Sequence, residues 1–221
     1  MNEAEIENLI STAISRLSRE ITARHQPFEG RIPGILFFLA RSGASFEKWL
    51  QLEFANALQR TAQENNLFID IWPEYGRFDI TIYQGDDFIA AIEIKHIANW
   101  WMPDFSLKRI DEDVAKLSER CEAEHKYALT FCIFAEPRKG MVPWMEKQLD
   151  DTDNAASTIE NFHERIREQY LRRIGQESSL LAGDDLADDL WFDRLRVDAV
   201  FARVGHGNNP FASAVSTGAD Q

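Results

Sequence analysis

The sequence predicts an α/β fold, and three observations lead to this prediction. Apolar residues recur at helical spacing in two segments near the N-terminus, and from Leu67 the spacing changes to the alternation of β-strands. A further helical pattern and a run rich in β-forming residues follow. Between residues 45 and 137 the predicted order is therefore helix, three strands, helix, strand, and the 221-residue length suits one domain with appendages.

Two amphipathic helices are expected before the first strand. Residues 3–22 carry one apolar helix face, made of Ile6, Leu9, Ile10, Ala13, Ile14, Leu17 and Ile21. A connector rich in Pro and Gly follows, and its apolar run from Ile32 to Ala40 is too short to span a bilayer, so we expect it in the core. The second helix is predicted over residues 45–66, with Ser45 as its cap.

Three strands are expected next, and the last two form a hairpin. Their segments are LFIDIWPEY, RFDITIY and FIAAIEIKHI, which start at Leu67, Arg77 and Phe88. The intervening QGDD has the composition of a tight hairpin turn. A third helix is predicted to begin near Ser106, and KYALTFCIFAEP reads as a buried strand closed by Pro137.

The C-terminal part is predicted to be a mostly helical extension. Ser157 and Glu160 have the spacing of a capping box for a helix that runs to about Arg173, and WFDRLRVDAVFARV predicts a late strand. The last residues lack periodicity, which predicts a disordered tail. The expected organisation is an N-terminal helix and connector in 1–44, a core in 45–140, an acidic helical extension with the late strand in 141–204, and the tail in 205–221.

The charge of the chain limits its partners. The net charge is −13, which excludes a uniformly basic nucleic-acid-binding surface, so such a partner must meet a local patch. Between Glu146 and Asp193 there are 13 acidic and 5 basic residues, and this region is a candidate for binding a protein partner or for shielding a DNA site. The N-terminus carries early acids and is amphipathic, unlike a signal peptide, so we expect a cytoplasmic protein without a membrane partner.

Three charged residues interrupt the hairpin strands. Glu93 and Lys95 point to one side of their strand, and a hairpin brings Asp79 of the preceding strand beside Glu93. Two carboxylates on a largely apolar sheet are costly unless a cation joins them. Mg²⁺, or Mn²⁺ as its substitute, prefers such oxygen ligands, and the backbone carbonyl of Ile94 is a reasonable further ligand. Lys95 would then serve the water or the phosphate in hydrolysis of a phosphodiester.

This arrangement resembles the PD-(D/E)xK nuclease superfamily, which includes restriction endonucleases, junction resolvases and repair nucleases. The resemblance rests on RFD (Arg77–Asp79) and EIK (Glu93–Lys95) within the matching order of elements over residues 45–137. It implies a restriction-endonuclease-like core, with Asp79 and Glu93 as catalytic metal ligands and Lys95 as the catalytic lysine. Phe78 stands where the family has a proline before the aspartate.

The resemblance also implies an acid from the first core helix, which would reach the metal or the attacking water. We favour Glu53 as this catalytic and metal-binding acid and keep Glu47 and Glu74 as second choices. On a helical wheel the direction of Glu53 is surrounded by apolar side chains, namely Phe46, Trp49, Leu50 and Ala57.

Candidate substrate contacts follow the third strand. Trp100 lies in an aromatic loop whose rings suit stacking on a base, although packing of the loop onto the core explains them too. Lys108, Arg109 and Lys116 on the predicted third helix are candidates for phosphate contacts, with a solvated helix face as the alternative.

The expected function is a Mg²⁺-dependent nuclease that acts on DNA in restriction, repair or defence. The resemblance implies a homodimer as well, because many such enzymes cut both strands as dimers. The alternative is a catalytically silent nuclease-like fold that serves as a nucleic-acid- or protein-binding regulatory module. The acidic net charge favours this alternative because it repels DNA, whereas the presence of all three core residue types favours the enzyme.

Overall fold

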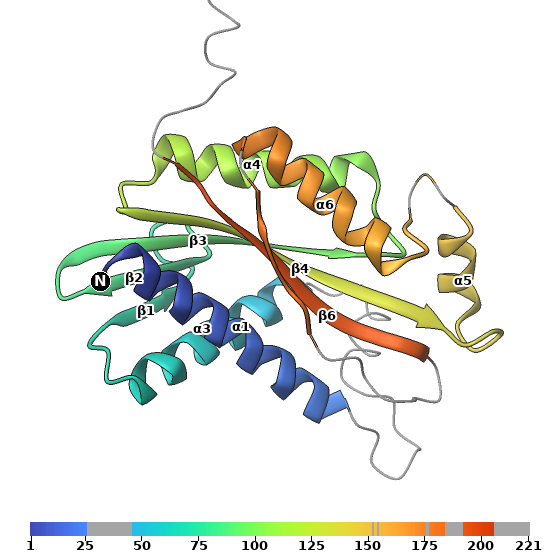
Figure 1. Cartoon of the computed structure of the whole chain (residues 1–221), viewed down its shortest axis with the longest axis horizontal. Helices are drawn as coiled ribbons and strands as arrows, with labels where there is room; N and C mark the ends of the chain where they lie inside the picture. Colours follow the sequence, from blue (N-terminus) through green and yellow to red (C-terminus); the bar gives the residue numbers. More distant parts are fainter. Residues whose placement is uncertain (26–45, 152, 154, 176, 184–191, 206–221) are drawn as a thin grey trace, which may run out of the picture.

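In the part of the chain that the structure describes, a mixed six-stranded sheet separates two pairs of helices (Figure 1). The computed structural model describes residues 1–25, 46–151, 153, 155–175, 177–183 and 192–205. The helices are α1 (Glu3–His25), α3 (Phe46–Glu64), α4 (Asp104–Arg120), α5 (Pro143–Leu149) and α6 (Ile159–Ile174). The strands are β1 (Asp70–Pro73), β2 (Ile80–Gln84), β3 (Asp87–Ala98), β4 (His125–Pro137), β5 (Ser179–Leu181) and β6 (Phe192–Arg203), in the spatial order β1-β2-β3-β4-β6-β5. The α/β prediction is confirmed.

The first four strands follow the predicted order. Strands β1, β2 and β3 are antiparallel neighbours, whereas β3 and β4 run parallel. A parallel pair needs a crossover connection, and α4 provides it. Helix, three strands, helix, strand is therefore confirmed as α3, β1 to β3, α4 and β4. The predicted hairpin turn lies between β2 and β3, where Gly85 has a φ of +63°, a conformation that glycine adopts without steric cost.

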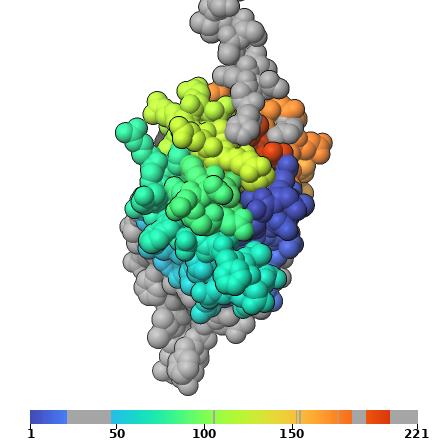
Figure 2. All heavy atoms as spheres, turned by 90° about the vertical axis from the view of Figure 1, so that its left-hand side faces the viewer, coloured from blue at the N-terminus to red at the C-terminus, as the bar shows by residue number. Residues whose placement is uncertain are grey.

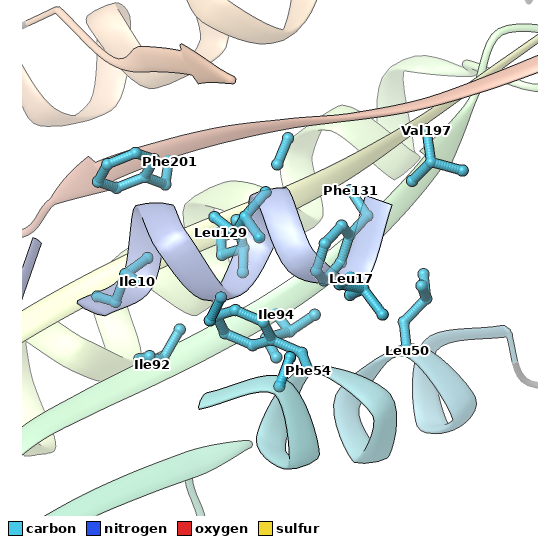
Figure 3. Close-up of a cluster of buried hydrophobic side chains, with 14 of the residues drawn as sticks. Ile10, Leu17, Leu50, Phe54, Ile92, Ile94, Leu129, Phe131, Val197 and Phe201 are labelled. Atoms are coloured by element: carbon cyan, nitrogen blue, oxygen red, sulfur yellow. The ribbon is translucent and has the colours of Figure 1, made fainter. Parts of the chain in front are cut away.

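The two faces of β3 carry different side chains. Ile92 and Ile94 join a core in which α1 and α3 pack on one face of the sheet (Figure 3). Alternate residues of a strand point to opposite faces. Glu93 and Lys95 therefore point to the other face, where each of them contacts a side chain of α4. The predicted alternation places the candidate catalytic residues between the sheet and this crossover helix.

The C-terminal extension completes the same sheet. The predicted late strand is confirmed as β6, which pairs antiparallel with β4, while α6 packs beside α4. The expected capping box is wrong by one residue, because Thr158 rather than Ser157 caps α6 and accepts a hydrogen bond of 3.2 Å from the Asn161 backbone N–H. A capping hydroxyl accepts from the residue two or three positions later, which fits Thr158 and Asn161.

Several predictions lie outside the described residues. These are the Ser45 cap, the buried run from Ile32 to Ala40, and nearly all of the tail, from residue 206 onward. The described helices include none that is long and apolar enough to cross a membrane.

Candidate active site

The candidate site lies where β2 and β3 separate. Their register ends with Ile80 opposite Ile92, so the next part of β3 has no partner from β2. The Asp79 carboxylate occupies this position instead, and its Oδ2 accepts a hydrogen bond of 2.7 Å from the backbone N–H of Ile94. This hydrogen bond fixes Asp79 at the open edge of β3. In a continuous strand pair the Ile94 N–H would instead donate to the backbone of the neighbouring strand.

The backbone carbonyl of Ile94 faces the same edge. Within one strand residue the N–H and the C=O point in the same direction in the plane of the sheet. Since the Ile94 N–H points to Asp79, its carbonyl oxygen points toward the gap between the two strands. The direction of this oxygen is compatible with its predicted role as a ligand.

Glu93 lies beside Asp79 in a poorly hydrated position, with 3% of its surface exposed. Burial, and then the negative charge of Asp79, raise the pKa of Glu93 to about 7, although Lys116 opposes this shift from 2.6 Å away. Burial also raises the pKa of Asp79, against the lowering effect of the Ile94 N–H. The two carboxylates therefore share a dry location with too little positive charge to keep both fully ionised at neutral pH.

Lys95 is held between two acids from different helices. Its Nζ lies 3.2 Å from Asp113 Oδ2 on α4 and 3.5 Å from Glu47 Oε2 on α3. Burial raises the pKa of Asp113 to about 6, although the charge of Lys95 and its hydrogen bond lower it. The ammonium group of Lys95 is consequently oriented from both sides of the sheet.

Glu47 reaches this lysine around the open edge of β3. It lies in the first turn of α3, on the side of the sheet opposite α4, and its Oε2 is 3.6 Å from His96 Nδ1. Burial alone would raise the pKa of Glu47, but the hydrogen bond with His96 and the charge of Lys95 outweigh burial and lower it. Glu47 is therefore an ionised acid at neutral pH.

The ion pairs leave the site short of positive charge. Asp79, Glu93, Asp113 and Glu47 contribute four carboxylates, against the two ammonium groups of Lys95 and Lys116. Among these six side chains, two formal negative charges remain when all four acids are ionised, and the exposed Arg109 adds a positive charge near Glu47. One divalent cation would balance the two negative charges, and the raised pKa values show the electrostatic cost that such a cation would remove.

On the first core helix, the structure shows Glu47 in contact with Lys95, whereas the role of Glu53, which the sequence favoured, stays a prediction. Glu53 is partly buried and lies six residues further along α3, about 9 Å along the helix axis. Of the apolar neighbours that favoured Glu53, Trp49, Leu50 and Ala57 belong to the face that packs on the sheet. Contact with Lys95 instead involves Glu47 in the first turn of the helix. Glu74 is exposed and forms an ion pair with Lys48 at the surface.

Trp100 does not meet the requirement for stacking on a substrate. Only 8% of its surface is exposed, and its ring packs edge-on against Trp144, with the centroids 6.4 Å apart. The structural alternative for the aromatic loop is correct for this residue. Lys108 and Arg109 are exposed on α4, and Arg109 is near enough to help lower the pKa of Glu47.

The sequence analysis did not name Asp113 as a candidate, although it contacts Lys95. Lys116, expected to contact phosphate or solvent, instead forms an ion pair with Glu93. Asp113 and Lys116 lie on α4 at a spacing of three, so they share a helix face, and Lys116 also lies over the Phe78 ring at 5.4 Å. A signal was available, because a helix that connects parallel neighbours must cover one face of the sheet. Polar residues that flank the apolar stripe of this helix were therefore candidates to meet Glu93 and Lys95.

No protein-family model, curated protein or solved structure matches the chain. Within the described residues, no group of three or more His, Cys, Asp or Glu side chains is arranged to hold a metal ion. The site combines the carboxylate pair of Asp79 and Glu93, an open strand edge, and a lysine oriented by Asp113.

Proposed function

We propose that this protein is a Mg²⁺-dependent nuclease with a restriction-endonuclease-like core that hydrolyses phosphodiester bonds of DNA. The observation that carries the proposal is the meeting of Asp79, Glu93 and Lys95 at the edge where β2 and β3 separate. These are the residues on which the resemblance to the PD-(D/E)xK superfamily rests. The order of α3, the three strands, α4 and β4 supports the same assignment.

The donor set fits a magnesium ion. Magnesium in phosphoryl-transfer sites is held by one or two carboxylates, with water and substrate phosphate completing its shell, so a third acid is not required. Asp79 and Glu93 supply the carboxylates, the Ile94 carbonyl faces the same gap, and the acids outnumber the lysines by two. When bound there, Mg²⁺ would supply Lewis-acid stabilisation of the phosphate and lower the pKa of a water molecule.

The chain's own residues position the remaining groups. Hydrolysis forms a bond between a water oxygen and phosphorus, breaks the bond from phosphorus to the leaving oxygen, and moves a proton from the water to the leaving group. Lys95 lies where it can donate a hydrogen bond to a phosphate oxygen or orient the attacking water. Asp113 and Glu47 are positioning residues, since they hold the Lys95 ammonium from opposite sides of the sheet.

The direct test is cleavage of plasmid, linear and single-stranded DNA, and of RNA, with Mg²⁺ or Mn²⁺ and with EDTA. We expect metal-dependent cleavage of DNA by the wild type and none by Asp79→Asn, which keeps the size of the side chain but loses its charge. Asp87→Asn is the control, because Asp87 is exposed at the other end of the hairpin. Folded wild-type protein that neither cleaves nor gains thermal stability from either metal would favour the catalytically silent module instead.

The two first-helix acids are expected to differ in activity. Glu47→Gln should lower cleavage roughly 10- to 100-fold, because Lys95 loses a charged partner that orients it. Glu53→Gln, the matched change on the same helix, should stay within about twofold, since Glu53 lies about 9 Å further along the helix axis than the acid that contacts Lys95. Initial rates at saturating metal measure both, and an equal loss in the two variants would contradict the role given to Glu47.

A further inference from the structure

A hollow on the sheet has a lining that contains neither Asp79 nor Glu93. Its volume is about 430 Å³, and its lining consists of Asp70, Trp72, Tyr75, Tyr83, Gly85 and Asp86. We call these six residues the aromatic pocket. Figure 2 views the molecule from the side on which β1, β2 and the β2–β3 turn lie, where teal to green residues form much of the surface. The volume lies within the range of small-molecule sites.

The strand pairing explains why the aromatic rings gather there. Asp70 and Trp72 alternate with Ile71, which packs into the core under α3, so both point to the other face. Asp70 is the register partner of Tyr83, which places that ring on the same face. Among the described residues, the main contacts of helix α4 with the sheet are to β3 and β4, and Trp72 at this end is 53% exposed.

Tyr75 completes the pocket from a turn with an unusual backbone. Its ring centroid lies 6.3 Å from that of Trp72 and 6.1 Å from that of Tyr83. The neighbouring residues Glu74 and Arg77 both have positive φ values, of 55° and 78°, which non-glycine residues rarely adopt. A hydrogen bond of 2.9 Å from the Glu74 N–H to the carbonyl of Asp79 holds this turn. A strained turn therefore maintains a ring that is itself 57% exposed.

The composition of the lining determines the charge of a suitable ligand. Aromatic rings present a negative electrostatic face, which attracts cations that lie over them. Two carboxylates, Asp70 and Asp86, add to this negative potential, and no Lys or Arg is among the described residues of the lining. A nucleotide could stack on the rings, but its phosphate would meet the same two carboxylates. An organic cation satisfies both features of the pocket.

We propose that the aromatic pocket binds an organic cation of the alkylammonium class, with a quaternary or methylated ammonium head against Trp72, Tyr75 and Tyr83. Asp70 and Asp86 supply the opposite charge at its rim. The head group can come from a free small molecule or from a methylated lysine of a partner protein. The proposal is independent of the nuclease function, because the pocket lining includes none of the residues proposed for cleavage.

The sharpest test compares choline with 3,3-dimethylbutan-1-ol, which has the same shape but no charge. Titration calorimetry with the full chain is expected to show choline binding and at least roughly tenfold weaker binding of the neutral alcohol. Equal binding of the two would show an apolar hollow and overturn the proposal, as would no binding of choline at millimolar concentration. A peptide carrying trimethyl-lysine tests the protein source, and tighter binding than choline would assign the site to a partner.

Variants locate the binding. Trp72→Ala and Tyr75→Leu should each weaken choline binding roughly tenfold or more, while Trp72→Phe, which keeps a ring, should retain part of it. Trp101→Ala is the matched control, because Trp101 is 47% exposed and lies outside the pocket lining. An equal effect of Trp101→Ala would overturn the assignment. Binding of thymidine monophosphate in preference to choline would also overturn it, in favour of a base-stacking surface.

Discussion

Lys95→Ala is expected to remove metal-dependent DNA cleavage, with a loss of roughly 10²- to 10³-fold or more. The Lys95 ammonium is held by Glu47 and Asp113 at the strand edge beside the carboxylate pair. Its removal withdraws a charge that would act on the phosphate or the attacking water, and it leaves the carboxylate pair in place. Metal binding, measured by thermal shift with Mn²⁺, should therefore persist in the variant while cleavage is lost.

Stability has to be separated from catalysis in this experiment. Lys95 is buried, and its loss leaves Asp113 and Glu47 without their shared partner, which is expected to cost about 3 kcal/mol. The double variant Lys95→Ala with Asp113→Asn removes one of these acids and should recover part of that stability without recovering cleavage. Lys147→Ala is the control for loss of a lysine, because Lys147 is exposed on α5 and is not among the proposed site residues. Retained cleavage in a folded Lys95→Ala protein would contradict the catalytic role.

The part of the site that the sequence predicted is the part that local geometry determines. A hairpin with a two-residue turn fixes its register, and the period of two then decides which side chains share a face. The placement of Glu93 and Lys95 on one face follows from these rules, whereas the approach of Asp79 to Glu93 also depends on the register shift between Ile82 and Tyr83. Burial of three charges in the best β-sequence of the chain was itself the signal.

The remaining site residues depend on packing between elements far apart in the sequence. The choice between Glu47 and Glu53 depends on where α3 begins relative to the free edge of β3, which no periodicity encodes. Asp113 joins the site only because α4 crosses directly over Glu93 and Lys95. Trp100 is buried and packs edge-on against Trp144, and that contact joins segments on either side of β4 in the sequence. Helical patterns identified α1, α3, α4 and α6 but not their positions on the sheet, and the short helix α5 was not predicted.

The C-terminal extension shows the same limit at the level of the fold. Its late strand was predictable from alternation, yet the sequence alone did not show that β6 joins β4 in the middle of the sheet. Pairing with a strand that lies more than 50 residues earlier in the chain is a nonlocal contact. Such contacts depend on which strand edges and apolar faces remain to be covered. Here the edge of β4 that β3 does not pair with presents backbone N–H and C=O groups, and β6 pairs with them.

Glu93→Gln is expected to stabilise the protein at neutral pH while it removes metal binding. Burial and the charge of Asp79 raise the pKa of Glu93 from 4.5 to about 7, so the ionised side chain is unfavourable in the fold. A pKa shift of that size corresponds to at most ~3.4 kcal/mol. Loss of the ion pair with Lys116 offsets part of the gain. We therefore expect a net stabilisation of about 1–2 kcal/mol, or roughly 3–6 °C in Tm for a chain of this length.

The pH dependence follows from the direction of the shift. A carboxyl whose pKa is raised by folding binds more protons in the folded state than in the unfolded state, so its contribution to stability is greatest at low pH. That contribution is lost as pH rises from about 4.5 through about 7. Glu93→Gln has no carboxyl group to ionise and so does not lose this stability. Its free energy of unfolding should exceed that of the wild type by little near pH 4.5 and by the full amount above about pH 8. Thermal unfolding in EDTA across this range measures it, with the exposed-acid variant Glu112→Gln as the control.

Metal should reverse the order of stability between the two proteins. A divalent cation neutralises the carboxylate pair, so Mg²⁺ or Mn²⁺ is expected to stabilise the wild type and raise its Tm. The gain is about 2.7 kcal/mol at 100 times the Kd, which exceeds the advantage expected for Glu93→Gln. Glu93→Gln should gain little, because its amide is a weaker ligand and the negative charge is gone. The distinguishing quantity is the metal-dependent change in Tm at pH 8. If Glu93→Gln lowers the Tm in EDTA and the wild type gains nothing from metal, Glu93 is a structural partner of Lys116, and the metal site proposed at this strand edge is wrong.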